Sequence, residues 1–182
     1  HLNSFFIDIK PTLIEDCKPI TANMEKRGGG ILDIELVDKT DALANYYQLH
    51  GTFETLDAMG ANFINSCLEQ FAKTLVRKAA THTDLKGEEP IEIVMSILSN
   101  YVPNCLVRAE VRCTIDALEP EEGMTKREFA EKFVRAVEIA RIEPHRAVTH
   151  NKGIMNGIDA VVLATGNDFR AVEAGIHAYA SR

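Results

Sequence analysis

Two residues near the C-terminus, Lys152 and Asp168, are of the types that catalysis at a carbonyl group requires. Asp168 lies in an apolar, small-residue run (residues 160–172), so we expect it to be buried, where a carboxylate needs a cation or several donors. In one straight helix the Cα atoms of Lys152 and Asp168 would lie about 24 Å apart. We therefore expect a break in the helix at Gly153–Gly157, which would bring the side chains of Lys152 and Asp168 together. A lysine beside a carboxylate in a glycine-lined pocket can polarise a carbonyl oxygen, and a Schiff-base lysine is open on the same evidence.

Residues 55–62 join an expected strand to a long expected helix and form a second candidate site. The unpaired N–H groups and the dipole of a helix N-terminus favour an anion such as pyrophosphate. Gly60 permits close approach of the backbone, and Asn62 supplies both a donor and an acceptor. The alternative is that Asp57 is a helix N-cap and Gly60 a packing glycine. The spacing alone favours this alternative.

The composition of the 182 residues, with 46% hydrophobic and 26% charged side chains, is that of an ordinary globular protein. The net charge of −7 argues against a nucleic-acid partner, which clustered cations would bind. No apolar run approaches the roughly 20 residues that cross a bilayer, so we expect no membrane partner. The four cysteines lack metal-ligand spacing, which indicates reduced thiols in a cytoplasmic protein without a metal site.

Hydrophobic periodicity predicts an α+β fold, an antiparallel sheet with helices on one face. The expected helices are 11–26, with Pro19 bending or breaking the first, and 57–78; the expected strands are 31–37, 46–55, 91–98 and 106–115.

The character of the chain changes after residue 115. Thr125 and Glu128 fit a capping box that opens a helix to about Ile142, which Pro144 ends, and residues 145–182 read as interrupted helix. We expect one domain at residues 1–115, incomplete at its N-terminal side, and part of a second at 116–182. Because the sequence has no initiator Met and stops inside a helical pattern, we expect a fragment.

The motifs in these segments resemble the class II, bacterial-type branch of the 3-hydroxy-3-methylglutaryl-coenzyme A (HMG-CoA) reductase family. In order along the chain, the matching segments are residues 24–30 (MEKRGGG), 57–62 (DAMGAN), 98–101 (LSNY), 150–157 (HNKGIMNG), 164–168 (ATGND) and 170–175 (RAVEAG). One such motif is a weak signal, but the ordered set is specific and covers nearly the whole chain.

This resemblance implies a small ferredoxin-like sheet domain that binds the cofactor, joined to part of a mainly helical large domain that binds substrate. It implies reduction of HMG-CoA to mevalonate and coenzyme A, with two equivalents of NADH or NADPH, and the reverse reaction. It also implies a homodimer with the active site at the interface. No motif in the sequence decides between NADH and NADPH.

The resemblance also assigns residues to roles. It implies that Lys152 polarises the carbonyl and that Asp168 lies in the hydrogen-bond network beside it. The matching substrate-binding residues are Arg146, Thr149 and Asn156, and the matching cofactor-binding residues are Asp57, Met59, Gly60, Asn62 and Asn100. The family's upstream catalytic glutamate motif and its C-terminal catalytic histidine have no match. We therefore expect less than half of an enzyme, inactive alone; the alternative is a nucleotide-binding module without catalysis.

Overall fold

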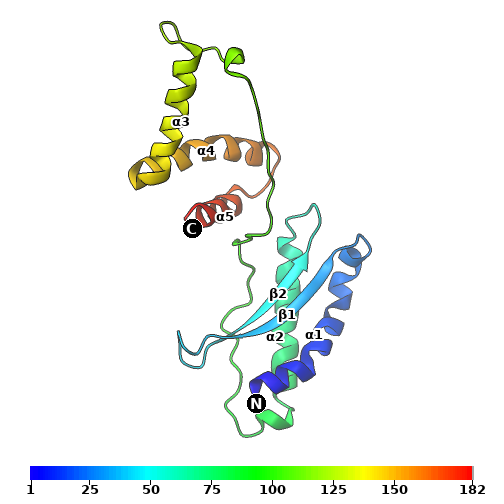
Figure 1. The fold of residues 1–182 in the computed structure, drawn as a ribbon. Coiled ribbons are helices and arrows are strands. Elements are labelled where there is room, and N and C mark those ends of the chain that lie inside the picture. Colours follow the sequence, from blue (N-terminus) through cyan, green and yellow to red (C-terminus); the bar gives the residue numbers. More distant parts are fainter. Residues whose placement is uncertain (182) are drawn as a thin grey trace. The chain divides into compact units, whose positions relative to one another are not determined.

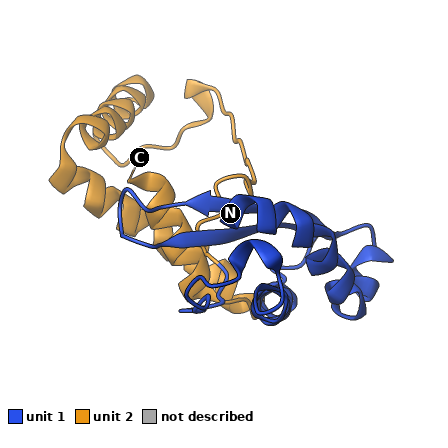
Figure 2. Cartoon of the chain, turned by 90° about the horizontal axis from the view of Figure 1, so that it is seen from below, with its two compact units in different colours: residues 1–98 blue, residues 99–182 orange. Residues whose placement is uncertain are grey.

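The computed structural model describes residues 1–181, and the chain forms two compact units (Figure 2). Unit 1 comprises residues 1–98 and unit 2 residues 99–182. The division falls earlier than the boundary at 115/116 expected from the sequence. The physical reason is that residues 106–115, expected as a strand of the same sheet, form no strand that would hold them to unit 1.

Unit 1 consists of a β-hairpin and two long helices that pack against each other (Figure 1). The elements are α1 (Leu2–Glu25), β1 (Gly30–Asp38), β2 (Tyr47–Glu54), α2 (Ala61–Ala79) and a 3₁₀ turn η1 (Thr83–Leu85). The strands are antiparallel, with Glu35 opposite His50 and a register shift between Ile31 and Asp33. The expected pairing of these two strands is confirmed.

The core of unit 1 lies between the hairpin and the helices. Ile34 of β1 is fully buried, because alternate residues of a strand point to one face. It packs in one cluster with α1 and α2 side chains at helical spacing, namely Phe5, Phe6, Ile9, Leu13, Cys17, Cys67, Phe71 and Leu75. The helices therefore cover one face of the sheet, as expected.

Helix α1 is longer than the sequence predicts and is not ended by its prolines. It begins at Leu2 rather than near Pro11, and Pro11 and Pro19 both lie inside it. Proline removes a backbone donor and normally breaks a helix. Both prolines are on the exposed side, while every turn of the opposite side is buried in the core. Burial of that apolar side offsets the loss of backbone hydrogen bonds.

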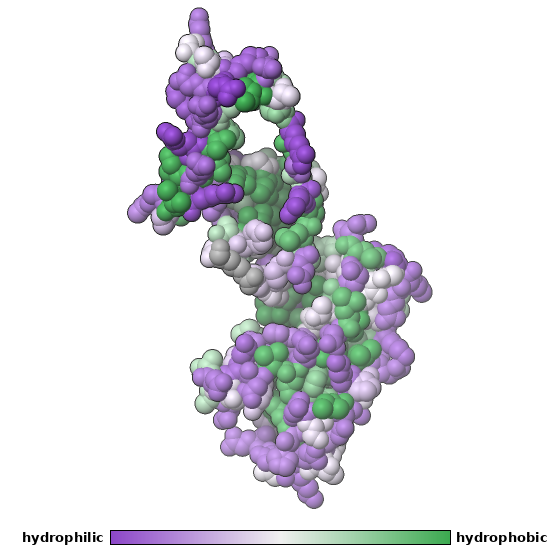
Figure 3. Space-filling view, in the orientation of Figure 1, coloured by the Kyte–Doolittle hydropathy of each residue, from purple (hydrophilic) through white to green (hydrophobic). Residues whose placement is uncertain are grey.

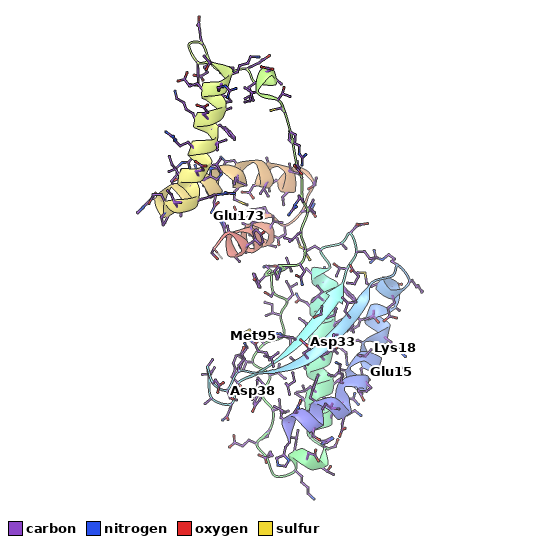
Figure 4. All side chains as sticks on the ribbon, viewed as in Figure 1. Glu15, Lys18, Asp33, Asp38, Met95 and Glu173 are labelled. Atoms are coloured by element: carbon purple, nitrogen blue, oxygen red, sulfur yellow. The ribbon has the colours of Figure 1, made fainter. Side chains whose placement is uncertain are left out.

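Asp33 anchors β1 to α1 (Figure 4). Its Oδ1 atom accepts a hydrogen bond from Lys10 Nζ at 2.6 Å, and this bond lowers the pKa of the Asp33 carboxyl. The carboxylate is thus held in the form that pairs with the lysine.

The expectation of four strands is wrong for the part of the chain that the structure describes, where the sheet has two strands. Residues 91–98 and 106–115 form no ladder. Leu98 N instead donates to Asn65 Oδ1 of α2 at 3.0 Å. An alternating pattern indicates which side chains a strand would bury, but a ladder also requires a neighbouring strand edge with free N–H and C=O groups.

Unit 2 is helical after an extended segment. Its elements are a 3₁₀ turn η2 (Ile115–Ala117), α3 (Lys126–Ile142), α4 (Pro144–Ala164) and α5 (Phe169–Ala180). The predicted start of α3 is confirmed, since Thr125 Oγ1 accepts from Glu128 N at 3.2 Å. Its predicted end is confirmed too, because Pro144 is the first residue of α4.

Unit 2 buries few apolar side chains. Ala140 and Met155, where α3 packs on α4, are its buried apolar residues among those described. Larger ones, such as Phe133 at 64% and Val107 at 99% exposure, face solvent, and Figure 3 shows apolar patches on the surface. No helix within residues 1–181 is long and apolar enough to cross a membrane.

Candidate active site

The segment from Glu54 to Gly60 is a compact turn between β2 and α2. Thr55 donates its hydroxyl to Ala58 O at 2.7 Å, and Ala58 N donates to Thr55 O at 3.1 Å. Leu56 N donates to Glu54 Oε1 at 2.8 Å. These bonds fix the backbone of the segment while leaving the side chains of Asp57 and Met59 exposed.

Helix α2 begins at Ala61, so the expectation that it begins at Asp57 is wrong. The N-cap is Gly60, with φ 74°, and no side chain caps the helix. The left-handed backbone at Gly60 follows the Thr55–Ala58 turn and delays the helix to Ala61. Asp57 is therefore not the N-cap, and the alternative interpretation of this segment fails on that point. The first N–H groups of α2 are left without a side-chain acceptor, next to the exposed Asn62.

Gly60→Ala is expected to lower the free energy of unfolding of unit 1 by about 1–3 kcal/mol, from backbone strain alone. A Cβ at this position would also lie 2.5 Å from Thr55 Cγ2, so the turn itself must move. Urea unfolding followed by circular dichroism measures the change. Gly157→Ala is the control, because that glycine is helical with open space around it and alanine favours helix there. Equal stability of Gly60→Ala and the unchanged chain would contradict this geometry.

Helix α4 is continuous through Gly153 and Gly157, so the expected break is wrong. Apart from the helix's own nearby backbone, a Cβ at either glycine would meet no atom within 4 Å, and both adopt ordinary helical backbone. The helix runs on from Lys152 to Ala164, a rise of about 18 Å. Within residues 1–181, no hydrogen bond or ion pair joins Lys152 to Asp168.

The continuous helix instead brings together the lysine and the three expected substrate residues. Arg146, Thr149, Lys152 and Asn156 follow one another at spacings of three or four residues. At 3.6 residues per turn they share a sector of about 120° on the helix surface. Thr149, Lys152 and Asn156 are exposed and Arg146 is half-buried, while Met155, about 60° beyond Lys152 around the helix, is buried. The sector is thus an open polar face with Lys152 at one edge.

Glu143 fixes the start of this helix. Its Oε2 atom accepts from Arg146 N at 2.7 Å, and its Oε1 atom lies 2.9 Å from His145 Nδ1. The hydrogen bond with His145, followed by that from Arg146 N, lowers the pKa of the Glu143 carboxyl. An ionised Glu143 caps the helix and complements its dipole.

Asp168 is not buried, in contrast to the expectation. The chain leaves the helix at Thr165–Asn167, and Asp168 is the N-cap of α5 with 44% of its side chain exposed. Its Oδ1 atom accepts from Arg170 N at 3.1 Å and Ala171 N at 3.3 Å. The Ala171 amide, and then the charge of Arg170, lower the pKa of the Asp168 carboxyl. Asp168 is therefore an anion held by backbone donors rather than by Lys152.

Asn100 belongs to unit 2, whereas the other expected cofactor residues belong to unit 1. Its carbonyl oxygen would lie 3.0 Å from a Cβ placed on Gly175. The absence of a side chain at Gly175 therefore lets α5 approach the backbone of Asn100.

Sequence reasoning missed two features near these segments. Leu56 has a left-handed backbone, φ 56°, which is strained for a leucine. Asp159 of α4 has a solvent-shielded Oδ1 atom without a hydrogen-bond partner. No local signal indicates the first. The position of Asp159 could have been noticed in the sequence, because Asp159 lies at helical spacing from Asn156 and Lys152.

Comparison with known proteins decides the family. The model of a family described as hydroxymethylglutaryl-coenzyme A reductase matches residues 5–182. The chain belongs to this family. The resemblance predicted from the motifs is thereby confirmed.

Relatives of this HMG-CoA reductase family chain come from archaea and bacteria. A 3-hydroxy-3-methylglutaryl-coenzyme A reductase of Archaeoglobus fulgidus is 36% identical over 166 residues, which are 91% of this chain and 34% of that protein. A protein of Borreliella burgdorferi named probable 3-hydroxy-3-methylglutaryl-coenzyme A reductase is 34% identical over 181 residues, 100% of this chain and 39% of that protein. The chain thus spans little more than a third of these relatives.

Solved structures of the Streptococcus pneumoniae HMG-CoA reductase are similar to nearly the whole chain. One has a TM-score of 0.70 at 35% identity and covers 98% of this chain and 45% of its own. Another, a class II reductase bound to NADPH in open conformations, has a TM-score of 0.71 with the same identity and coverage. The mixed helix and hairpin architecture is thus shared with reductases of known structure.

Proposed function

We propose that this chain supplies the cofactor-binding segment and the substrate-activating helix of an enzyme that reduces HMG-CoA to mevalonate and coenzyme A with two equivalents of NAD(P)H. The observation that carries the proposal is the open face of α4, where Lys152 and Asn156 of the matching segment 150–157 lie together with Arg146 and Thr149. Since the chain spans 34–45% of its relatives, turnover belongs to a polypeptide of their length that contains these residues.

Lys152 is proposed to donate a hydrogen bond and a positive charge to the carbonyl oxygen of the thioester and, in the second step, of the aldehyde. Each reduction turns that oxygen into an alkoxide, and a fixed cation stabilises the charge as it develops. Lys152 is exposed, whereas a Schiff-base lysine is usually activated by burial among apolar groups or by a neighbouring cation. Exposure thus favours the carbonyl-polarising role.

Arg146, Thr149 and Asn156 are proposed to bind the hydroxymethylglutaryl part. The guanidinium suits the free carboxylate of this group, and the hydroxyl and amide suit its hydroxyl. Asp168, held ionised by the start of α5, is proposed to complete the hydrogen-bond network around the lysine. In the single chain it is not in contact with Lys152, so this role requires an arrangement that the whole enzyme provides.

The start of α2 suits a nicotinamide dinucleotide. When bound, this cofactor supplies the hydrides. Gly60 presents bare backbone, and the uncapped N–H groups of the first turn of α2 suit an anionic pyrophosphate. We propose that Asp57, Met59, Gly60 and Asn62 bind NADH or NADPH, and we propose a cofactor-binding role for Asn100 as well.

Asp57→Ala is expected to raise the dissociation constant for the nicotinamide cofactor about tenfold, because a carboxylate in a nucleotide site accepts hydrogen bonds from ribose hydroxyl groups. Since Asp57 does not cap α2, the urea midpoint should stay unchanged. Calorimetric titration of the reductase with NADPH and NADH in parallel measures the affinity and identifies the preferred cofactor. The exposed carboxylate of Asp41, in the β1–β2 turn, is the matched control as Asp41→Ala. Unchanged affinity in Asp57→Ala would show that the pocket is misplaced.

The finer features of the parent enzyme are proposals as well. We propose that unit 1 belongs to a ferredoxin-like domain whose sheet has further strands, and unit 2 to a mainly helical large domain. We also propose a cytoplasmic homodimer acting in the mevalonate route to isoprenoids, with the exposed face of α4 at the subunit interface. A nucleotide-binding module without catalysis is the alternative, and it would bind NAD(P)H without forming mevalonate.

A further inference from the structure

The carboxylate of Asp159 on α4 is the polar group of unit 2 whose surroundings the proposed function does not account for. Its Oδ1 atom is shielded from solvent and has no hydrogen-bond partner among the described residues. Leaving a buried acceptor unpaired is costly, so such an atom calls for a reason. Asp159 lies between the buried side of α4, marked by Met155, and the open face that holds Lys152.

The helix itself offers Asp159 one donor. Its neighbours three and four residues away are Met155, Asn156, Val162 and Leu163, and only the Asn156 amide among these side chains carries an N–H group. Helical side chains lean toward the N-terminus, so the carboxylate of Asp159 leans toward Asn156. In turn, the amide of Asn156 leans toward Lys152, one turn earlier.

We propose that Asp159 is a positioning residue of the reductase site, which orients the Asn156 amide and through it the Lys152 ammonium. In the whole reductase the amide nitrogen of Asn156 donates to Asp159 Oδ1, the atom that has no partner within residues 1–181 of the single chain. The amide oxygen then faces the other way and accepts from Lys152 Nζ. The three side chains occupy positions i, i+4 and i+7 of one helix, and the row keeps the lysine pointing at the substrate carbonyl. This inference rests on the proposed function.

Steady-state kinetics of the whole reductase test whether Asp159 positions Lys152 through Asn156. Asp159→Leu, which removes the acceptor at similar volume, should lower kcat about tenfold or more with the KM for the cofactor unchanged. Asp159→Asn keeps an oxygen acceptor and should stay within about threefold of the original kcat. The thermal midpoint of Asp159→Leu should hold, because the exposed Asn156 amide can bond to water instead and the leucine adds apolar burial at similar volume. A purely structural carboxylate would instead lower the midpoint.

A double-mutant cycle identifies the route of the effect. If Asp159 acts through Asn156, then Asp159→Leu should cause little further loss of kcat in an Asn156→Ala background. Glu131→Ala, an exposed carboxylate on α3, is the matched control. An unchanged kcat in Asp159→Leu, or losses that add fully in the double variant, would overturn the inference. Absence of mevalonate formation by the unaltered reductase would instead refute the proposed function itself.

Discussion

Lys152→Ala is expected to lower kcat for mevalonate formation by about 100- to 1000-fold, since a group that stabilises a developing oxyanion contributes on the order of 3 kcal/mol. Lys152 is the lysine of the open α4 face and has no partner of its own within the described part of the chain. Both reduction steps should be lost together, because each generates negative charge on the same oxygen. The measurement is a steady-state assay with HMG-CoA, and separately with the aldehyde as substrate.

The control for this variant is Lys132→Ala, which removes an exposed lysine of α3 that pairs with Glu128 at 3.0 Å. It should leave kcat unchanged. Cofactor affinity should also persist in Lys152→Ala, because the cofactor segment lies in the other unit of the chain. Near-normal turnover in Lys152→Ala would refute the role assigned to the lysine.

Phe71→Ala is expected to destabilise unit 1 by about 3–5 kcal/mol, the usual effect of removing a buried aromatic ring and leaving a cavity. Phe71 is 1% exposed and stacks on Phe53 of β2, with 6.3 Å between ring centroids. It therefore links α2 to the strand that leads into the cofactor segment. Urea unfolding monitored by circular dichroism gives the change in the free energy of unfolding.

Ile7→Ala provides the comparison, because Ile7 lies on α1 with 62% exposure. Its effect should stay within about 0.5 kcal/mol. Similar effects of the two substitutions would mean that the core is not where the structure places it.

Local signals predicted several elements correctly. The hairpin follows from period-two alternation around Ile34, and the limits of α3 follow from the Thr125 cap and Pro144. Each of these signals acts through neighbouring residues, so a sequence displays it directly. The motif segments also identified the family, although not the arrangement of their side chains.

Other features depend on contacts that are distant in sequence. Gly153 and Gly157 look like breaks, yet α4 continues through them, because glycine permits a turn without requiring one. Pro11 and Pro19 look like limits of α1, yet the core holds that helix together from Phe5 to Met24. Asp168 was expected in a buried run and instead caps α5, a role that needs the break at Thr165–Asn167.

The most direct test of the account is an assay of the reductase containing these residues, with HMG-CoA and each nicotinamide cofactor. We predict that two equivalents of NADPH or NADH are oxidised for each mevalonate and coenzyme A formed. Binding of the cofactor without HMG-CoA-dependent oxidation would contradict the account and support a nucleotide-binding module instead.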